Sequence, residues 1–316
     1  MAYLVTGGTG LIGARIVRDI VREGKQAIAY DLYPDRTMVE QLLDSKEKEL
    51  VKIITGDVTD LPHLIHTVQD NKVDKIIHIA GLLSDASKAI PYKAMKINCE
   101  GTVNIFETAR ILGLSKVVWS SSIGVFGTED RYPEGYIAND APHYPHGVYG
   151  ACKSFNESMA IHYCEAYDMD IIGLRYCFVY GAGQKSGESA SVVRELVEKP
   201  ALGKPGKVPF SDDTVNWIYV DDAARATMMA ANSPKTKTKA FTVGGYRHSL
   251  REVAAYIKSI VPGADITLQP GLIGISSKYE TTPIKEQIGF VPQWTMERGM
   301  KDMVNNIRKQ AGLPLV

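Results

Sequence analysis

A glycine-rich stretch near the start of the chain, TGGTGLIG at residues 6–13, restricts the possible folds more than any other feature of the sequence. It follows an apolar run at residues 2–5 and precedes a helical pattern. A strand, a glycine turn and a helix in this order are typical of a dinucleotide-binding unit. Gly7 permits the sharp turn, Gly10 lets the backbone approach a pyrophosphate, and Gly13 lets the helix pack near the strand.

An acidic residue follows this stretch at the distance that dinucleotide binding requires. Asp31 closes a second apolar segment, residues 26–31. A carboxylate at this place holds both hydroxyls of an adenosine ribose and repels the additional phosphate of NADP. The first N–H groups of the helix, at Leu11, Ile12 and Gly13, present the positive end of a helix dipole to the phosphates. We therefore predict that the chain binds NAD.

The composition argues against several other classes of protein. Lys and Arg together total 36, as do Asp and Glu, so the formal charge is zero and gives no bulk attraction to nucleic acid or an anionic membrane. No apolar run approaches the roughly 18 residues of a membrane span, and the first residues lack the features of a signal peptide. The four cysteines form no CxxC pair and have no zinc-like spacing with histidine. We expect no metal site, reduced thiols and a cytoplasmic location.

Strand and helix patterns alternate along roughly the first 180 residues. This alternation predicts an α/β fold built on a doubly wound parallel sheet with right-handed crossovers. Beyond it, the pattern loosens into a stretch rich in Gly, Ser and Pro. We predict a dinucleotide-binding domain over residues 1–180, rejoined by about 215–245, and an interleaved substrate lobe over residues 181–214 and 246–316.

Small and polar residues stand where the predicted third and fourth strands end, at the edge where such sheets place their ligands. Asp57 is placed to accept from an adenine amino group while Val58 packs on the ring, or else Asp57 caps the following helix. Ala80 and Gly81 end the fourth strand and let its edge contact the cofactor. His78 lies between apolar residues and fits a hydrogen-bonded core histidine better than a catalyst.

A phenol and an ammonium lie four residues apart in a helical pattern at residues 148–167. This spacing places Tyr149 and Lys153 on one helix face, and we expect Lys153 to lower the pKa of Tyr149 and to hold the nicotinamide ribose. A tyrosine tuned in this way exchanges a proton with a substrate hydroxyl. Ser122 ends the fifth strand and is placed to hold the substrate oxygen. Asn98 is a further candidate for the cofactor site, which orders a water or bonds backbone near Lys153, or else is an interhelical amide.

Together these motifs resemble the extended short-chain dehydrogenase/reductase family, in its NAD-dependent epimerase/dehydratase group. The resemblance covers nearly the whole chain and includes GDVTD at 56–60, HIAG at 78–81, SSSIGVFG at 120–127, YGACK at 149–153 and YVDDAARA at 219–226. It implies that Ser122, Tyr149 and Lys153 form the catalytic set, and that the residues lining the NAD site include Asp31, Asp57, Val58 and Ala80. It also implies a homodimer in which the helices at 92–112 and 148–167 pair with their copies as a four-helix bundle.

The sequence departs from sugar-nucleotide epimerases at two positions. Phe178 stands where they carry an asparagine, three residues after Arg175, and Val215 stands where they carry an arginine that neutralises a diphosphate. The loss of such charge-assisted bonds, about 1.5–3 kcal/mol each, argues against a nucleotide-diphosphate sugar. Arg175 is either an anion contact or a structural arginine. The residues that we name as lining of a substrate pocket are Phe178, Tyr180, Lys185 and Trp217.

Three functions are compatible with these patterns. The first is an NAD-dependent oxidoreductase that acts on a secondary alcohol or ketone of a small polar substrate, and SSIGVFG resembles the threonine 3-dehydrogenase-like branch. The second is a sugar or nucleotide-sugar 4-epimerase that keeps NAD bound through its cycle. The third is a non-catalytic NAD sensor, against which the intact set of Ser122, Tyr149 and Lys153 argues.

Overall fold

The computed structural model describes residues 1–133, 135–184 and 188–316. Its centre is a seven-stranded sheet in the order β10-β6-β5-β4-β1-β2-β3, and every neighbouring pair in it is parallel. The sheet confirms the predicted fold class. Its strands are β1 Ala2–Thr6, β2 Gln26–Asp31, β3 Val51–Thr55, β4 Val73–His78, β5 Lys116–Ser122, β6 Ile171–Tyr176 and β10 Ala240–Val243.

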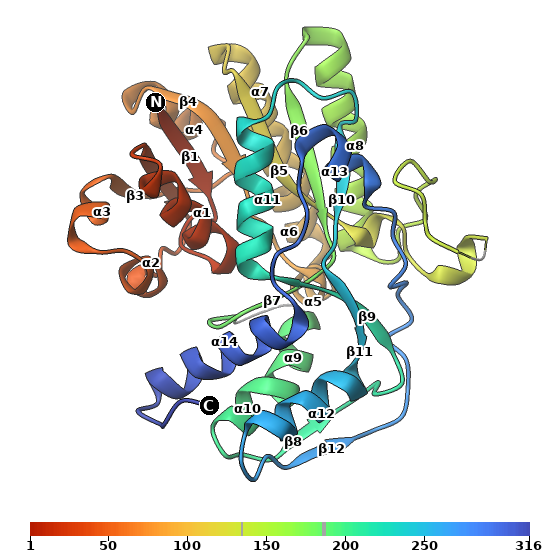
Figure 1. Cartoon of the computed structure of the whole chain (residues 1–316). Coiled ribbons are helices and arrows are strands. Elements are labelled where there is room, and N and C mark those ends of the chain that lie inside the picture. The colour runs from red at the N-terminus through yellow and green to blue at the C-terminus, as the bar shows by residue number, and fades with distance from the viewer. Residues whose placement is uncertain (134, 185–187) are drawn as a thin grey trace.

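Helices cover both faces of this sheet (Figure 1). Alternate residues of β1 show the two faces: Tyr3 and Val5 pack in one apolar cluster, and Leu4 packs in another. The first cluster contains α1 Leu11–Arg22 and α11 Val220–Asn232. The second contains α4 Leu61–Asp70, α7 Gly101–Leu112 and α8 Val148–Tyr167. The helices α2 Arg36–Leu42, α3 Ser45–Glu49, α5 Ser84–Ala89, α6 Pro91–Met95 and α13 Thr282–Ile288, with the short turns Ile123–Val125 and Glu129–Arg131, complete this part of the chain.

A smaller lobe lies below the main sheet in Figure 1 and has its own apolar core. It contains a three-stranded sheet, in the order β11-β9-β7, and a two-stranded sheet, β12-β8. Its strands are β7 Phe178–Tyr180, β8 Gly206–Val208, β9 Thr214–Tyr219, β11 Tyr246–Ser249 and β12 Ile266–Leu268. Its helices are α9 Glu188–Val193, η4 Arg194–Glu198, α10 Lys199–Ala201, α12 Leu250–Ile260 and α14 Met296–Gln310.

The chain passes between the two parts several times. A single sixth strand over residues 170–179 is predicted, but β6 ends at Tyr176 and the chain leaves the main sheet there. The next residue, Cys177, still donates its N–H to Val243 of β10, and Phe178 already pairs with Trp217 in the small sheet. After β9, helix α11 and strand β10 return to the main sheet, so the lobe is interleaved with it.

Two predicted helices are interrupted. A helix over residues 37–48 is predicted, but α2 ends at Leu42 and Asp44 caps a separate helix α3 through a capping box with Glu47. The predicted helix 92–112 is continuous but contains a π-helical turn, η1 Lys96–Glu100, between α6 and α7. Such turns occur frequently at functional sites.

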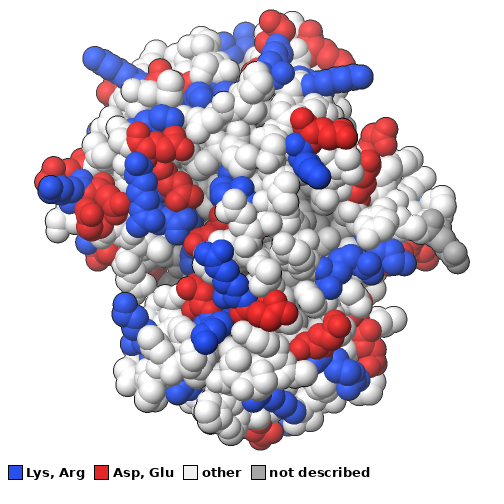
Figure 2. Space-filling model, in the orientation of Figure 1, with Lys and Arg blue, Asp and Glu red and all other residues white. Residues whose placement is uncertain are grey.

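The surface of the molecule carries both signs of charge. Figure 2 shows Lys and Arg interspersed with Asp and Glu over the visible face. Among the described helices, none is both long enough and apolar enough to cross a membrane. The described residues also contain no cluster of three or more His, Cys, Asp and Glu side chains arranged to hold a metal ion.

Candidate active site

The glycine turn between β1 and α1 has the conformation that a pyrophosphate site needs. Gly7 has a φ of 65°, in the left-handed region, and a Cβ on it would lie 2.9 Å from the backbone nitrogen of Ala80. A Cβ on Gly13 would lie 2.0 Å from the carbonyl oxygen of Gly7, so the helix packs directly on the turn. Gly10 is exposed and caps α1, with the first N–H groups of the helix following it. These residues fit a dinucleotide phosphate.

Asp31 ends β2 beside this turn. One of its carboxylate oxygens accepts from the hydroxyl of Thr9 at 2.8 Å and from the Thr9 backbone N–H at 3.4 Å. The turn and the carboxylate are therefore held in one unit, and Asp31 is half-buried at the edge where the ribose of a dinucleotide lies.

The residues after β3 differ in part from expectation. Asp57 does not cap α4, because Asp60 does so by accepting from the N–H of His63. Asp57 instead accepts from the N–H of Thr59 at 2.9 Å, within the turn after the strand. Val58 is buried against the position of Gly101, where a Cβ would lie 2.6 Å from it. Both residues remain predicted adenine contacts.

The predicted core role of His78 is confirmed. Its ring is fully buried at the end of β4, and its nitrogens lie 2.6 Å from the hydroxyl of Thr6 and 3.0 Å from that of Thr102. Burial lowers the pKa of His78 to about 3, so the ring is neutral at ordinary pH. The Thr6 hydroxyl also accepts from the N–H of Ala80, which ties the end of β4 to β1.

Asn98 bonds backbone, as one of its predicted alternatives requires. Its amide oxygen accepts from the N–H of Leu82 at 2.8 Å, and its amide nitrogen donates to the Leu82 carbonyl at 2.9 Å and to the Ser87 hydroxyl at 3.3 Å. A Cβ on Gly81 would lie 3.0 Å from the Asn98 amide oxygen and 4.0 Å from Nζ of Lys153. Asn98 therefore fixes the loop after β4, and Asn98 and Lys153 both approach Gly81.

The structure brings Ser122, Tyr149 and Lys153 together at the end of β5. Oγ of Ser122 accepts from the N–H of Gly124 at 3.0 Å, and a Cβ on Gly124 would lie 3.3 Å from this oxygen and 3.8 Å from Cδ1 of Tyr149. Nζ of Lys153 donates to the carbonyl oxygen of Ser120 at 2.6 Å and lies 5.6 Å from the centre of the Tyr149 ring. The geometry suits a phenol that shares its proton with a bound hydroxyl or carbonyl.

The expected effect of Lys153 on the phenol is wrong for this structure. Burial raises the pKa of Tyr149 to about 12, although the neighbouring Ser122 hydroxyl opposes the rise. Burial also lowers the pKa of Lys153 to about 8, because its ammonium is withdrawn from water with only 2% of the residue exposed. Desolvation is the largest cause of both shifts, and Tyr149 is held as a proton donor.

Arg175 is a structural arginine and not an exposed anion contact. It is 5% exposed, and its guanidinium donates to both carboxylate oxygens of Glu157, at 2.8 and 2.5 Å. The same carboxylate accepts from the Ser121 hydroxyl at 2.5 Å, and Arg175 also donates to the Asn139 carbonyl. This network joins β5, β6 and α8.

The aromatic residues named as substrate contacts lie in the core of the lobe. Trp217 is 2% exposed, donates its indole N–H to the His248 carbonyl and packs edge-on against Phe178 at 4.8 Å between ring centres. The structure therefore does not support Trp217 or Phe178 as pocket lining, because both are packed in the apolar core of the lobe. Tyr180 is likewise 1% exposed, and Lys185 lies outside the described residues.

Val215 and its acidic neighbours have structural roles. Val215 is 1% exposed within the core of the lobe. The carboxylate of Asp213 accepts from the N–H groups of Ile273 and Gly274, at 2.6 and 3.3 Å, and Asp212 accepts from the N–H of Gly271. These acidic side chains hold a loop of the lobe.

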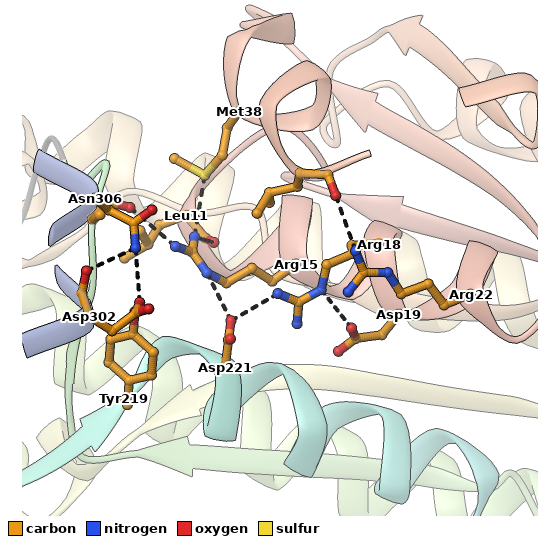
Figure 3. A network of polar contacts seen from close by, with 12 residues as sticks. Leu11, Arg15, Arg18, Asp19, Arg22, Met38, Tyr219, Asp221, Asp302 and Asn306 are labelled. Atoms are coloured by element: carbon orange, nitrogen blue, oxygen red, sulfur yellow. Dashed lines mark hydrogen bonds and ion pairs between the residues drawn. The ribbon is translucent and has the colours of Figure 1, made fainter. Parts of the chain in front are cut away.

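Sequence reasoning missed the arginine that links the glycine turn to the lobe (Figure 3). Arg15 of α1 is 6% exposed and donates to the carbonyls of Leu11 and Ala182 and to the carboxylate of Asp221, at 2.9, 3.2 and 3.1 Å. Arg18 donates to the same Asp221 oxygen at 3.1 Å. The available signal was an arginine on the apolar face of an otherwise amphipathic helix.

A parallel α/β sheet with a glycine-turn phosphate site, and a Ser–Tyr–Lys set at the end of its fifth strand, define an extended short-chain dehydrogenase/reductase. Residues 3–244 match the model of the NAD dependent epimerase/dehydratase family. The chain belongs to this family, and its cofactor is NAD.

Relatives named for different activities align with nearly the whole chain. A UDP-glucose 4-epimerase from Mycolicibacterium smegmatis is 30% identical over 322 residues, with 98% of this chain and 100% of the relative covered. The structure of a Thermus thermophilus UDP-glucose 4-epimerase in complex with NAD has a TM-score of 0.82 at 26% identity, covering 98% and 99% of the two chains. A partial consensus L-threonine 3-dehydrogenase has a TM-score of 0.88 at 22% identity, covering 98% and 100%, a likeness of fold alone.

Proposed function

We propose that this protein is an NAD-dependent oxidoreductase that transfers a hydride between NAD and a secondary alcohol or ketone of a small polar substrate, such as a hydroxy acid, an amino acid or a sugar. The observation that carries the proposal is the placement of the Ser122 and Tyr149 side chains around Gly124, at the end of β5 and on the same side as the glycine turn. This pair presents a proton and a second hydroxyl to one substrate oxygen.

Each residue of the set has a separate role. When bound, NAD supplies the nicotinamide carbon that takes or gives the hydride. The Tyr149 hydroxyl gives a proton to a substrate carbonyl oxygen, or takes one from the hydroxyl in the opposite direction. Ser122 holds the same oxygen, and Lys153, anchored on Ser120 and beside the Tyr149 ring, is placed to hold the nicotinamide ribose. The residues that would hold the rest of NAD are Gly7, Gly10, Leu11, Ile12, Gly13, Asp31, Asp57, Val58, Ala80 and Gly81.

A 4-epimerase is the second candidate, because the relative from Mycolicibacterium smegmatis at 30% identity is named a UDP-glucose 4-epimerase. Such an enzyme returns the hydride to the same carbon and shows no net change in NAD. The nucleotide-sugar form is disfavoured by Val215, whose side chain is apolar and buried where a diphosphate-pairing arginine is expected. A non-catalytic NAD sensor is disfavoured because it needs no proton donor at Tyr149.

The experiment that tests the proposal follows the absorbance of reduced nicotinamide. The protein is mixed with excess NAD and a panel of L-threonine, other hydroxy acids, free sugars, sugar acids and nucleotide sugars. We expect net formation of NADH with one non-nucleotide class. A new sugar stereoisomer without net NADH would overturn the dehydrogenase in favour of the epimerase.

Replacing the proton donor separates catalysis from binding. We expect Tyr149→Phe to lower kcat by at least about 100-fold, the lower range for a general acid, while NAD binding measured by calorimetry stays within about twofold. Turnover that survives this change would contradict the assigned role of Tyr149.

The proposal includes a homodimer and a cytoplasmic location. Apolar side chains are exposed on the two helices predicted to pair: Tyr92 and Met95 of α6, and Phe155 and Ile161 of α8, are between 44% and 68% exposed. A second copy of the chain would cover these apolar side chains. The location remains a prediction from the sequence.

A further inference from the structure

A buried arginine lies at the junction between the glycine turn and the smaller lobe. Arg15 belongs to the second turn of α1, and only 6% of the residue is exposed. Its guanidinium donates to the carbonyl of Leu11 at 2.9 Å, to the carbonyl of Ala182 at 3.2 Å and to a carboxylate oxygen of Asp221 at 3.1 Å (Figure 3). One side chain therefore holds the first turn of α1 together with two points at the start of other segments.

The first turn of α1 needs an outside acceptor for its N–H groups. Gly10 caps this helix and has no side chain that accepts from them. The N–H groups of Leu11 and Ile12 are among those that we expect to donate to the pyrophosphate of NAD. A bound pyrophosphate would therefore restrain the same turn whose Leu11 carbonyl accepts from Arg15.

The two other points that this guanidinium holds lie at the ends of neighbouring strands of the lobe. Ala182 lies two residues after β7, which ends at Tyr180, and Asp221 lies two residues after β9, which ends at Tyr219. Tyr180 is directly opposite Tyr219 where β7 and β9 pair. The guanidinium is thus bonded beside the edge of the small sheet that is nearest in sequence to both segments.

Both tyrosines pack on α14, the last helix of the lobe. A Cβ on Gly299 would lie 2.1 Å from the Tyr180 hydroxyl and 3.1 Å from Cδ2 of Tyr219. The Tyr219 hydroxyl also donates to the carboxylate of Asp302, in the next turn of α14. Because these contacts are close, α14 cannot keep its place if the ends of β7 and β9 move.

Stability alone does not account for a guanidinium at this place. A buried ion pair contributes little to stability, because the cost of removing both charges from water offsets most of their attraction. Asp221 also accepts from Arg18 at 3.1 Å, so it keeps a cationic partner without Arg15. Arg18 makes its other bond to the neighbouring carboxylate of Asp19. The bonds that distinguish Arg15 are those to the two carbonyls.

We propose that Arg15 is a positioning residue that couples the NAD site to the lobe. NAD binding restrains the first turn of α1, Arg15 then holds the ends of β7 and β9 more firmly, and α14 becomes less mobile. Linkage makes the effect reciprocal, so the bonds of Arg15 also raise the affinity for NAD. The bound cofactor thereby orders the lobe before a substrate arrives, which goes beyond the reaction proposed above.

The test uses the full-length protein without substrate and measures two quantities. Amide hydrogen exchange in peptides from α14 is followed with and without saturating NAD, and calorimetry gives the NAD dissociation constant. In the wild type we expect NAD to slow exchange in α14 at least about fivefold, the lower range for coupled sites. In Arg15→Met this slowing falls below about twofold, and the dissociation constant rises at least about fivefold.

Two further variants separate positioning from charge and from folding. Arg18→Met is the matched control, because it removes a cation from the same Asp221 oxygen and leaves both carbonyl bonds of Arg15. It should keep both quantities within about twofold of the wild type. Arg15→Lys retains the charge, so it serves if Arg15→Met does not fold. We expect it to lose the slowing as well, because one ammonium does not reproduce the three bonds of a planar guanidinium.

Three results would overturn the proposal. The first is exchange in α14 that NAD leaves unchanged in the wild type. The second is slowing that persists in the Arg15 variants, and the third is an equal effect of Arg18→Met. Urea unfolding of each variant shows whether a change in exchange merely follows a loss of stability. Neither measurement involves turnover, so a failure here is distinct from a failure of the proposed reaction.

Discussion

At the scale of single residues, the buried ammonium of Lys153 makes the stability of the folded chain depend on pH. Its pKa falls from 10.5 to about 8 on folding, so the unfolded chain binds this proton more tightly. Below pH 8 this difference lowers the free energy of unfolding by about 3 kcal/mol. The stability of the wild type therefore rises with pH between about 8 and about 10.5. We expect Lys153→Met, which has no such titration, to lose about 3 kcal/mol of stability relative to the wild type across this interval.

Urea unfolding of both proteins at several pH values between about 7 and about 10 measures this difference. A difference in unfolding free energy that is independent of pH would show that Lys153 keeps its ordinary pKa in the folded chain.

Asp31 provides a test of cofactor choice. Its carboxylate, held by Thr9, is placed for ribose hydroxyls and against a further phosphate. We expect NAD to bind at least about 100-fold more tightly than NADP. We expect Asp31→Ala to lower the ratio of the NADP to the NAD dissociation constant by about tenfold or more, because the variant loses charge-assisted hydrogen bonds to the ribose. Calorimetry with both dinucleotides checks this, and equal dissociation constants in the wild type would refute it.

Residue identities at the site were predictable from the sequence, but their energetics were not. Tyr149 and Lys153 share a helix face because of their spacing, and Ser122 follows from the end of a strand. The direction of the Tyr149 pKa depends on how much water the fold removes, and burial reverses the expectation from spacing. Burial was also not predictable for Trp217. An aromatic ring is compatible with a pocket or with a core, and only the packing of the lobe shows that this ring is buried.

At the scale of elements, the glycine turn allows its structural and binding roles to be separated. We expect Gly13→Ala to lower the unfolding free energy by about 3 kcal/mol or more, because its Cβ would lie 2.0 Å from the carbonyl oxygen of Gly7. Gly10 is a matched control: its φ of −79° suits alanine, and the nearest atom would lie 3.3 Å away.

We therefore expect Gly10→Ala to change stability by about 1 kcal/mol at most and to raise the NAD dissociation constant by about tenfold, because the methyl group occupies the approach of the pyrophosphate. Thermal or urea unfolding and calorimetry on both variants separate the two effects. Equal loss of stability in the two variants would contradict this division of roles.

The elements themselves were predictable where the pattern is local. Strand and helix alternation places β1 to β5 and their helices, and the break between α2 and α3 was visible only as a capping box at Asp44. The division of residues 170–179 between two sheets was not visible, because Tyr176 and Phe178 belong to one apolar run and separate only through different pairing partners.

At the scale of the whole molecule, the proposed dimer is tested by its apolar face. Phe155 lies on α8 and is 46% exposed in the single chain. We expect Phe155→Glu to shift the protein from dimer to monomer in sedimentation, because a dimer would bury the new carboxylate. Leu272→Glu, at an exposed apolar residue of the lobe, should leave the dimer intact. A wild type that sediments as a monomer would refute the dimer.

The sequence by itself determined the fold class, and it predicted the candidate NAD site and the Ser122, Tyr149 and Lys153 set, because each follows from short motifs in a fixed order along the chain. Only the tertiary structure decided which ion pairs connect the elements around these sites. The Arg15 to Asp221 pair spans 206 positions and the Arg175 to Glu157 pair spans 18, so no local pattern reveals them. Burial, which sets the pKa values of Tyr149 and Lys153, likewise exists only once distant elements have packed together.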